Sequence, residues 1–422
     1  MTHVSIGRFN FELCADLYNR IFEIGWKGSG RSWGQLPTWW QHFQPTDAEA
    51  SHYHPWMIEF LKRVYYRPDS PPTFYYVGNL SSGEFDQVAC KATFVTHCED
   101  NLDRINTGHG WKPLEDIYRA YLAMITSRKV EVQQWPSGRW KWETDTDQLC
   151  HSPIETIGPW RFHTYTPTDI QLAVAALQEL LDAIEARLPP SATSFADAAA
   201  TAGTSGSSTL TMLPWADPSV REEGRILPNS FAGAFCDATA TTSFRYLAPG
   251  IRLPTIAEFR AQPFRDYEYV PWYLRELPRL RPIRPTLRVS LPVPARPPGL
   301  YLSGDNRDNR SWESGCHLLL PFSIGGQGWV RRSDDTILGR DYANDLSPRP
   351  GKTNSELYQC VENGCVPHRH VPIHHVLRNW AERVREGDWD VDEDGVSGGI
   401  GKWRVADTEE MWEKYRVPME IY

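Results

Sequence analysis

The sequence has few cysteines for its length, and it lacks the long apolar run of a membrane-spanning helix. Its 8 cysteines are irregularly spaced over 422 residues, which indicates free thiols in a reducing compartment rather than a disulfide scaffold. No apolar run approaches the roughly 20 residues that a spanning helix needs, and the beginning of the chain contains no apolar signal-peptide core. We therefore expect a cytoplasmic protein with no membrane partner.

Basic residues are fewer than acidic ones, and no Walker-type phosphate loop, GxxxxGK[ST], is present. The net charge of −9 excludes a generic nucleic-acid coat, so any polyanionic partner has to meet a local basic patch. Aromatic residues, in contrast, are abundant at 12%, with 18 tryptophans. This is more than packing alone needs, and it predicts stacking surfaces or large pockets.

Helical and extended patterns alternate along the chain, which favours the α/β class. Helical spacing of apolar residues occurs at residues 56–65, 114–125, 169–188 and 372–384. We expect Thr168 and Gln171 to cap the third of these helices and a last helix to be capped at Asp407 or Thr408. Strand-like runs lie at residues 73–77, 299–303 and 318–324, and residues 130–142 are typical of a β-hairpin.

Composition divides the chain into four parts. These are a tryptophan-rich helical N-terminal region at 1–70, a first part of an α/β core at 71–190, a low-complexity insertion at 191–224, and a second part of the core with C-terminal helices at 225–422. The segment from Ser191 to Thr211 is mostly Ala, Ser, Thr and Gly. Such a segment cannot bury enough apolar surface to fold, which predicts a linker or insertion.

The stretch from Arg265 to Arg288 (RDYEYVPWYLRELPRLRPIRPTLR) combines aromatic residues with a glutamate and a run of arginines. The two prolines that flank WYLREL favour a short helix, on which Trp272, Tyr273 and Glu276 lie within about one turn. A carboxylate held against apolar rings has a raised pKa and can transfer a proton near neutral pH. The alternative is an ordinary ion pair between Glu276 and a neighbouring arginine.

Closely spaced arginines accompany this glutamate, with prolines between them. Five lie within fourteen residues, at Arg275, Arg279, Arg281, Arg284 and Arg288. Because the prolines keep the segment extended, these side chains can contact several phosphates of a polyanion. The alternative is a surface arm that pairs with the chain's own carboxylates.

A second candidate site follows the strand-like run at residues 73–77. Gly78 and the two serines Ser81 and Ser82 precede a predicted helix. Strand, glycine and helix N-terminus in this order are how α/β proteins present a nucleophile or bind an anion. The alternative is an ordinary turn in which a serine only caps the helix.

Two clusters contain metal-ligand residue types at spacings that do not fit a metal site. The acidic stretch Asp388–Asp394 alternates carboxylates as an EF-hand loop does, but Gly399 stands where the closing glutamate belongs. The other cluster has a Cys-x4-Cys spacing wider than the usual zinc pair; its members are Cys360, Cys365, His368, His370, His374 and His375. We expect incidental histidines, a solvated acidic loop and no metal.

The segment Trp272–Pro278 (WYLRELP) resembles the signature of cyclodipeptide synthases, in which a tyrosine, three residues, a glutamate, an aliphatic residue and a proline follow in order. The segment Tyr76–Ser81 (YVGNLS) is similar to the strand, glycine and nucleophilic serine of that family. Tyr301 is similar to a family tyrosine that ends a later strand. The chain departs from the pattern at two places: a tryptophan stands where the motif tyrosine belongs, and one extra residue precedes the serine.

The resemblance implies a Rossmann-like core, similar to class I aminoacyl-tRNA synthetases, with a helical N-terminal region and insertions. The implied reaction joins the amino acids of two aminoacyl-tRNAs into a cyclic dipeptide without a cofactor, and the arginine-using fungal branch of the family is similarly long. Ser81, or Ser82 in its place, would accept the first aminoacyl group, and Glu276 would relay protons. The other implied site residues are Gly78, Tyr269 and Trp272 at the substrate, Tyr273 or Tyr301 at the amine, and Arg279, Arg281, Arg284 and Arg288 at the tRNA.

Two other classes of protein also fit the sequence. One is an unrelated α/β transferase whose aromatic pocket takes a small aromatic substrate. The other is a non-enzymatic interaction protein whose arginine arm docks a partner. Salt-sensitive tRNA binding favours the synthase, whereas a salt-insensitive thermal shift with a small molecule favours the transferase.

Limited proteolysis tests the predicted insertion. We expect a protease to cut the full chain first between Ser191 and Thr211, because a segment that buries little apolar surface offers extended backbone to the protease. Mass spectrometry of the first fragments identifies the cut. A first cut elsewhere, with this segment protected, would contradict the prediction.

Overall fold

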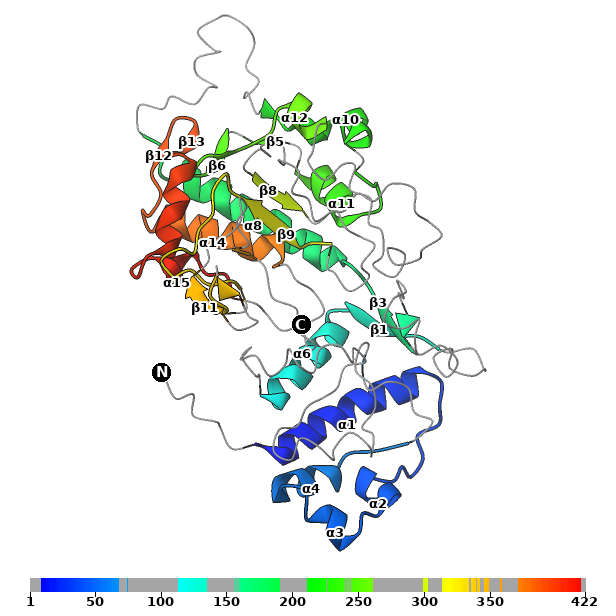
Figure 1. Ribbon diagram of the computed structural model, residues 1–422. Coiled ribbons are helices and arrows are strands. Elements are labelled where there is room, and N and C mark those ends of the chain that lie inside the picture. The colour runs from blue at the N-terminus through cyan, green and yellow to red at the C-terminus, as the bar shows by residue number, and fades with distance from the viewer. Residues whose placement is uncertain are drawn as a thin grey trace, which may run out of the picture. The chain divides into compact units, whose positions relative to one another are not determined.

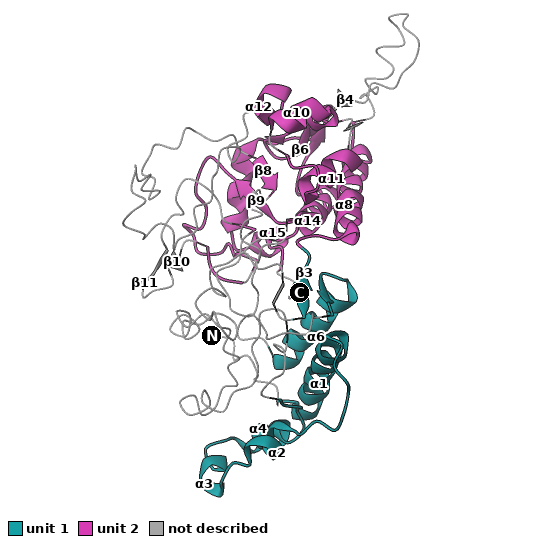
Figure 2. Ribbon diagram, turned by 90° about the vertical axis from the view of Figure 1, so that its right-hand side faces the viewer, with its two compact units in different colours: residues 1–163, 363–367, 420–422 teal, residues 164–362, 368–419 magenta. Residues whose placement is uncertain are grey.

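The structure is a computed structural model that describes residues 9–67, 74, 113–134, 156–157, 159–189, 211–224, 226–239, 241–242, 244–260, 299–302, 313–333, 335–338, 340–341, 345–348, 357–358 and 371–418. Helices and small sheets alternate in it (Figure 1). The chain forms two compact units, one of residues 1–163, 363–367 and 420–422 and one of residues 164–362 and 368–419 (Figure 2). Among the described helices, none is long and apolar enough to cross a membrane.

The first unit is built on α1 (Phe11–Gly28), whose buried face lies against α4 (Pro55–Leu61) and α6 (Leu114–Thr126). Two shorter helices, α2 (Trp39–Phe43) and α3 (Asp47–Ala50), each begin with a capping box. The helices predicted at 56–65 and 114–125 are thus confirmed, although the first ends at Leu61.

An antiparallel sheet of three strands completes the first unit. β3 (Trp160–Phe162) lies between β1 (Val130–Val132) and β2 (Thr156–Ile157). The last turns of α1 approach this sheet closely, because a Cβ on Gly25 would lie 2.7 Å from the Trp160 ring. Glycine therefore lets the helix and the sheet come together at this point.

Two strand predictions fall largely outside the described residues of the first unit. The second arm of the hairpin predicted at 130–142 is not described, and β1 pairs with β3 instead. Of the strand predicted at 73–77, only Phe74 is described. Its side chain is fully buried and stacks on Tyr121, with ring centroids 4.2 Å apart.

In the second unit, α8 (Pro167–Glu185) and α14 (Ile373–Arg385) lie side by side (Figure 1). A strand pair, β8 (Gly299–Leu302) and β9 (Cys316–Leu319), supplies Leu300, Leu302, Cys316 and Leu318 to the same core. The shorter elements are η3 (Pro214–Ala216), α10 (Pro218–Glu223), α11 (Phe231–Ala238), α12 (Ile256–Arg260), η4 (Ile400–Asp407) and α15 (Trp412–Tyr415).

The other strands of the second unit are short. A four-stranded sheet has the order β12 (Val391–Asp392), β13 (Gly395–Val396), β6 (Tyr246–Ala248) and β7 (Ile251–Arg252). Two further pairs are β4 (Thr211–Met212) with β5 (Thr241–Thr242) and β10 (Arg340–Asp341) with β11 (Asp345–Pro348). Between described strands, β13 with β6 is the one parallel pair. The mixed α and β composition is confirmed, and a Rossmann-like core stays a prediction.

The start of α8 differs from the prediction. Thr166, not Thr168, caps the helix, and it forms a capping box with Asp169 rather than with Gln171. Pro167 explains the earlier start, because its fixed φ suits the first helical position and its missing N–H is not needed there. The helix also ends earlier than expected, at Glu185.

Three tryptophans form the centre of the second unit's core. Trp380, Trp389 and Trp403 are at most 1% exposed, and their rings meet edge to face at centroid distances of 5.5 to 6.1 Å. Each indole N–H has a partner: the Tyr358 hydroxyl, the Tyr415 hydroxyl and the Pro249 carbonyl accept at 2.7 to 2.9 Å. Part of the tryptophan surplus therefore serves packing and not a binding site.

Asp407 is a buried carboxylate and not the predicted helix cap. It is 4% exposed and accepts four backbone N–H groups from the loop at residues 325–330, at 2.8 to 3.1 Å. The last helix, α15, begins only at Trp412. Asp407 was misassigned because its partners lie about 80 residues away, where no local capping signal can reveal them.

Replacing Asp407 by Asn tests this carboxylate. The amide substitutes a donor for one acceptor oxygen, so two buried N–H groups lose their acceptor, each at a cost of about 1–3 kcal/mol. We expect Asp407→Asn to lower the free energy of unfolding by roughly 3 kcal/mol, measured by urea denaturation. Asp394→Asn, at an exposed position of the same unit, is the control. Equal transitions for both variants would contradict this role.

Candidate functional site

The predicted catalytic and binding residues lie mainly outside the described part of the chain. This holds for Gly78, Ser81, Ser82, Tyr269, Trp272, Tyr273, Glu276, Arg279, Arg281, Arg284 and Arg288. Tyr301 is the predicted site residue that the structure describes. The meeting of Ser81 with Glu276 in one pocket therefore stays a prediction.

Tyr301 lies on β8, on the face of the strand directed away from the core. Its neighbours Leu300 and Leu302 both pack against the core, and side chains alternate between the two faces of a strand. Its ring lies over Gly299, because a Cβ on that glycine would be 2.9 Å from the ring and 3.3 Å from the hydroxyl oxygen. Tyr301 is half-buried, so the strand presents an aromatic side chain with a hydrogen-bonding hydroxyl.

Main-chain hydrogen bonds attach this strand pair to the start of α14. The Cys316 N–H donates to the Val371 carbonyl at 3.2 Å, and the Ile373 N–H donates to the Ser314 carbonyl at 2.8 Å. The two histidines of the predicted cluster follow directly, with ring centroids 4.1 Å apart and His374 buried. The other members of the cluster are not described. Within the described ranges, no three side chains are grouped to hold a metal.

The described cysteines are not suited to nucleophilic catalysis. Cys14, Cys236 and Cys316 are all buried. Burial raises the pKa of the Cys14 and Cys236 thiols to about 12 and also raises the pKa of Cys316. Because the thiolate is the nucleophile, these three side chains are protonated and inert at neutral pH.

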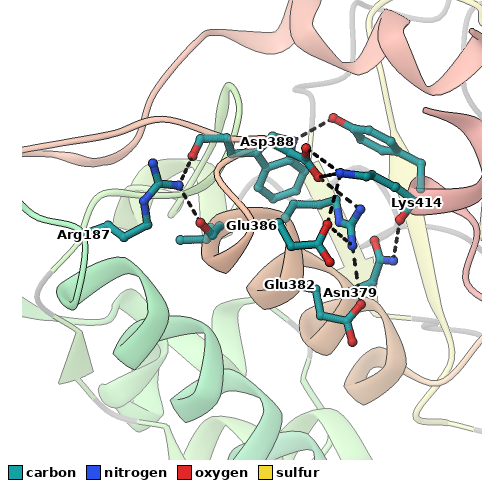
Figure 3. A network of polar contacts seen from close by, with 10 residues as sticks. Arg187, Asn379, Glu382, Glu386, Asp388 and Lys414 are labelled. Carbon is teal, nitrogen blue, oxygen red and sulfur yellow. Dashed lines mark hydrogen bonds and ion pairs between the residues drawn. The ribbon is translucent and has the colours of Figure 1, made fainter. Parts of the chain in front are cut away.

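A network of charges joins the end of α14 to α15 (Figure 3). Arg383 is 3% exposed and donates to Asp388 at 3.2 Å. Lys414 contacts both oxygens of Asp388, at 2.9 and 3.1 Å, and Glu386 at 3.2 Å. The contact with Asp388 and, to a smaller extent, that with Glu386 raise the pKa of Lys414. Because the charges satisfy one another, the network is a structural feature and not an open catalytic site.

The acidic stretch at 388–394 is only partly the solvated loop that was predicted. Asp388 belongs to the charge network, and its side chain is 13% exposed. The residues after it form the hairpin of β12 and β13, in which the Asp394 N–H donates to the Asp392 side chain at 2.9 Å. Asp392, Glu393 and Asp394 are exposed, as expected.

Glu313 is a polar centre that the sequence did not reveal. Its carboxylate accepts from the Thr164 hydroxyl at 2.9 Å and from the Phe231 N–H, at the start of α11, at 2.7 Å. The partial burial of the Tyr165 side chain raises its pKa, and the nearby Glu313 carboxylate raises it further. The partners of Glu313 are 82 and 149 residues away, so no local pattern indicates them. The contacts position α11 and do not form a site.

Exchanging Asp388 tests the charge network. Asp388→Asn removes the carboxylate nearest to the buried Arg383, and breaking a buried pair costs about 3–5 kcal/mol. We expect a loss of roughly 3 kcal/mol in the free energy of unfolding at pH 7. Folding raises the pKa of Lys414. The stabilisation that the charged Lys414 side chain gives to the folded state is therefore fully present below the ordinary pKa of a lysine, and it is lost only as the pH rises through the raised value.

Asp390→Asn is the matched control for this variant. Asp390 is 73% exposed and pairs with Lys402 at 3.2 Å, and such surface pairs contribute at most about 1 kcal/mol. Urea denaturation of the two variants compares them directly. A loss for Asp388→Asn no larger than that for Asp390→Asn would show that the network does not stabilise the unit.

Comparison with known proteins yields no relative from which a function could be transferred. No protein-family model matches the chain. Neither a curated protein nor a solved structure matches it.

Proposed function

We propose that this protein is a tRNA-dependent cyclodipeptide synthase with a Rossmann-like core. The observation that carries the proposal is the segment Trp272–Pro278, in which a glutamate follows two aromatic residues and precedes Leu-Pro. The segment Tyr76–Ser82, with its glycine and two serines, supports it. The absence of a Walker-type loop from the sequence agrees with a reaction whose substrates arrive already activated as tRNA esters.

The proposed reaction begins with an acyl-enzyme. The Ser81 hydroxyl attacks the ester carbonyl of the first aminoacyl-tRNA, and the bond to the terminal ribose breaks. The proton of the serine passes to the ribose oxygen, which leaves as a hydroxyl. Ser82 takes this role if the extra residue after Gly78 shifts the turn by one position.

The ring then closes in two steps. The amine of the seryl ester attacks the ester carbonyl of the second aminoacyl-tRNA, and Glu276 takes the amine proton and passes it to the departing ribose oxygen. The new terminal amine attacks the seryl ester, which releases the cyclic dipeptide and restores the serine. Tyr273 or Tyr301 holds the attacking amine through its hydroxyl.

Tyr301 suits this role by its place on β8. Its side chain points away from the core and is half-buried, and the strand pair holds its backbone in place. The described thiols are buried and protonated, and they offer no alternative nucleophile. A serine is the nucleophile that the motif favours.

Expression of the full chain in bacteria is the decisive experiment. Mass spectrometry of the medium is expected to find a cyclic dipeptide that cells with an empty vector do not make. If none appears with any supplied amino acid and purified aminoacyl-tRNA is not consumed, the proposal is wrong. A salt-insensitive thermal shift with a small aromatic molecule would then favour the transferase.

Three variants separate the roles of the serines and the glutamate. Ser81→Ala should abolish both the covalent aminoacyl adduct and the product, whereas Ser82→Ala should retain both. Glu276→Gln should keep the adduct but lower product formation by about 100-fold or more, because the amide preserves the shape and cannot relay a proton. Intact-protein mass spectrometry detects the adduct. Full activity of both serine variants would exclude the acyl-enzyme.

A further inference from the structure

The loop at residues 325–330 of the second unit is held in one conformation from two sides. Asp407 accepts four of its backbone N–H groups at 2.8 to 3.1 Å. The Arg331 guanidinium donates to carbonyl groups of the same loop, among them that of Gly328 at 3.0 Å, and lies 4.9 Å from the centroid of the Trp412 ring. A ligand that binds to a loop fixed in this way orders little of the chain, which lowers the entropic cost of binding.

One N–H group near the tip of this loop is not used by the chain. Gly325 and Gln327 donate to the same oxygen of Asp407, at 2.9 and 2.8 Å, and the Gly328 N–H donates to the Gly325 carbonyl at 3.3 Å. Gly326, between them, is exposed, and within the described ranges its N–H has no acceptor. The loop therefore presents a backbone donor to solvent in a fixed position.

The fold itself does not require glycine at position 326. The φ angle of Gly326 is not in the left-handed region, and a Cβ there would have no other heavy atom within 4 Å. Gly401, on η4, has the same two properties. Glycine also occurs where a ligand approaches the backbone closely, and this is the use that remains for Gly326.

An exposed arginine that pairs with no carboxylate lies beside the loop. The Arg404 guanidinium lies 3.9 Å from the centroid of the Phe322 ring, just before the loop, and no acidic side chain in the described part of the chain pairs with it. Side chains three residues apart eclipse on a 3-10 helix, so Gly401, Arg404 and Asp407 lie along one face of η4. The chain from Phe322 to Gly325 therefore runs along this face, from Arg404 to Asp407.

The charges around these groups favour a small anion. Residues 314–333 include no acidic residue, and the Asp407 carboxylate is engaged by its four backbone donors. Gln327 is exposed, and its side-chain amide supplies two further N–H donors. Glu409 and Glu410, which follow η4, are also exposed and oppose a long polyanion, so a single anionic group fits this place better than a nucleic acid does.

We propose that Gly326, Gln327 and Arg404 form a binding site for a phosphate group. Arginine, glutamine and backbone N–H groups are donors that phosphate oxygens meet in protein complexes, and the guanidinium fork matches two of these oxygens. Donors from two separate segments suit an anion with several oxygens, whereas a carboxylate offers only two. The phosphate group belongs either to inorganic phosphate or to a nucleoside monophosphate. The site does not depend on the synthase reaction.

Isothermal titration calorimetry of the full chain tests the site at neutral pH and constant ionic strength. The titrants are inorganic phosphate, adenosine monophosphate and acetate, each in a separate experiment. We expect phosphate to saturate the site and Arg404→Gln to weaken its binding about tenfold or more, because a hydrogen bond to a charged group is lost. Arg245→Gln is the matched control: Arg245 is exposed on the same unit and stacks on the Tyr246 ring at 5.6 Å, and its exchange should leave the affinity unchanged.

Gly326→Ala separates binding from folding. The added methyl group meets no other heavy atom within 4 Å, so urea denaturation should give the same transition as for the unchanged chain. Phosphate affinity should nevertheless fall severalfold, because the methyl group occupies the space next to the N–H donor. This variant also carries the test if Arg404→Gln does not fold.

The absence of saturable phosphate binding would overturn the site, and so would equal affinity in the unchanged chain and both variants. Acetate that binds as tightly as phosphate would overturn the assignment to a phosphate group. Tighter binding of adenosine monophosphate than of phosphate would support the site and identify a nucleotide as its ligand. Equal binding of the two would support the site with the free anion as its ligand.

Discussion

The core of the second unit encloses three indole rings, and each of their buried N–H groups requires a hydrogen-bond acceptor. An unpaired buried polar group costs free energy, so Trp380, Trp389 and Trp403 can be enclosed only where acceptors are brought to them. The acceptors come from three separate places in the sequence, Tyr358, Tyr415 and Pro249. Satisfying the indoles therefore joins segments that are up to 154 residues apart. The edge-to-face rings then fill the core that these segments enclose.

Several cations in both units are engaged by other groups of the chain. In the second unit, Arg383 and Lys414 are paired with carboxylates of the same chain, and Asp407 is fully used by backbone N–H groups. In the first unit, Lys27 pairs with Glu23, and Arg31 and Arg67 lie on the buried ring of Trp26. Charges that are engaged by other groups of the chain stabilise the fold, and the two guanidinium groups lie over a ring that is itself only 4% exposed.

The proposed synthase reaction places a requirement on a chain of this charge. A substrate that is an ester of tRNA brings a polyanion, unpaired bases and an activated carbonyl together. A chain with a net charge of −9 can bind such a substrate only through local basic surfaces. The arginines between residues 275 and 288 are the basic stretch that the sequence offers for this proposed role. Tyr301, on a strand that main-chain hydrogen bonds join to the start of α14, stays a prediction for the amino-acid part of this substrate.

From local apolar periodicity, the sequence alone predicted helices at 56–65, 114–125 and 372–384 and a strand at 299–303. The structure has these elements at 55–61, 114–126, 373–385 and 299–302. It also gave the candidate site residues Glu276, the serines after Gly78 and Tyr301, which stay predictions. Only the tertiary structure decided the roles of Asp407, Arg383 and Glu313, whose partners are distant in sequence or depend on burial. The stacking of Arg31 and Arg67 on the Trp26 ring was equally invisible in the sequence. The preference of a segment for helix or strand depends on residues close in sequence, whereas contacts between distant segments exist only once the chain has folded.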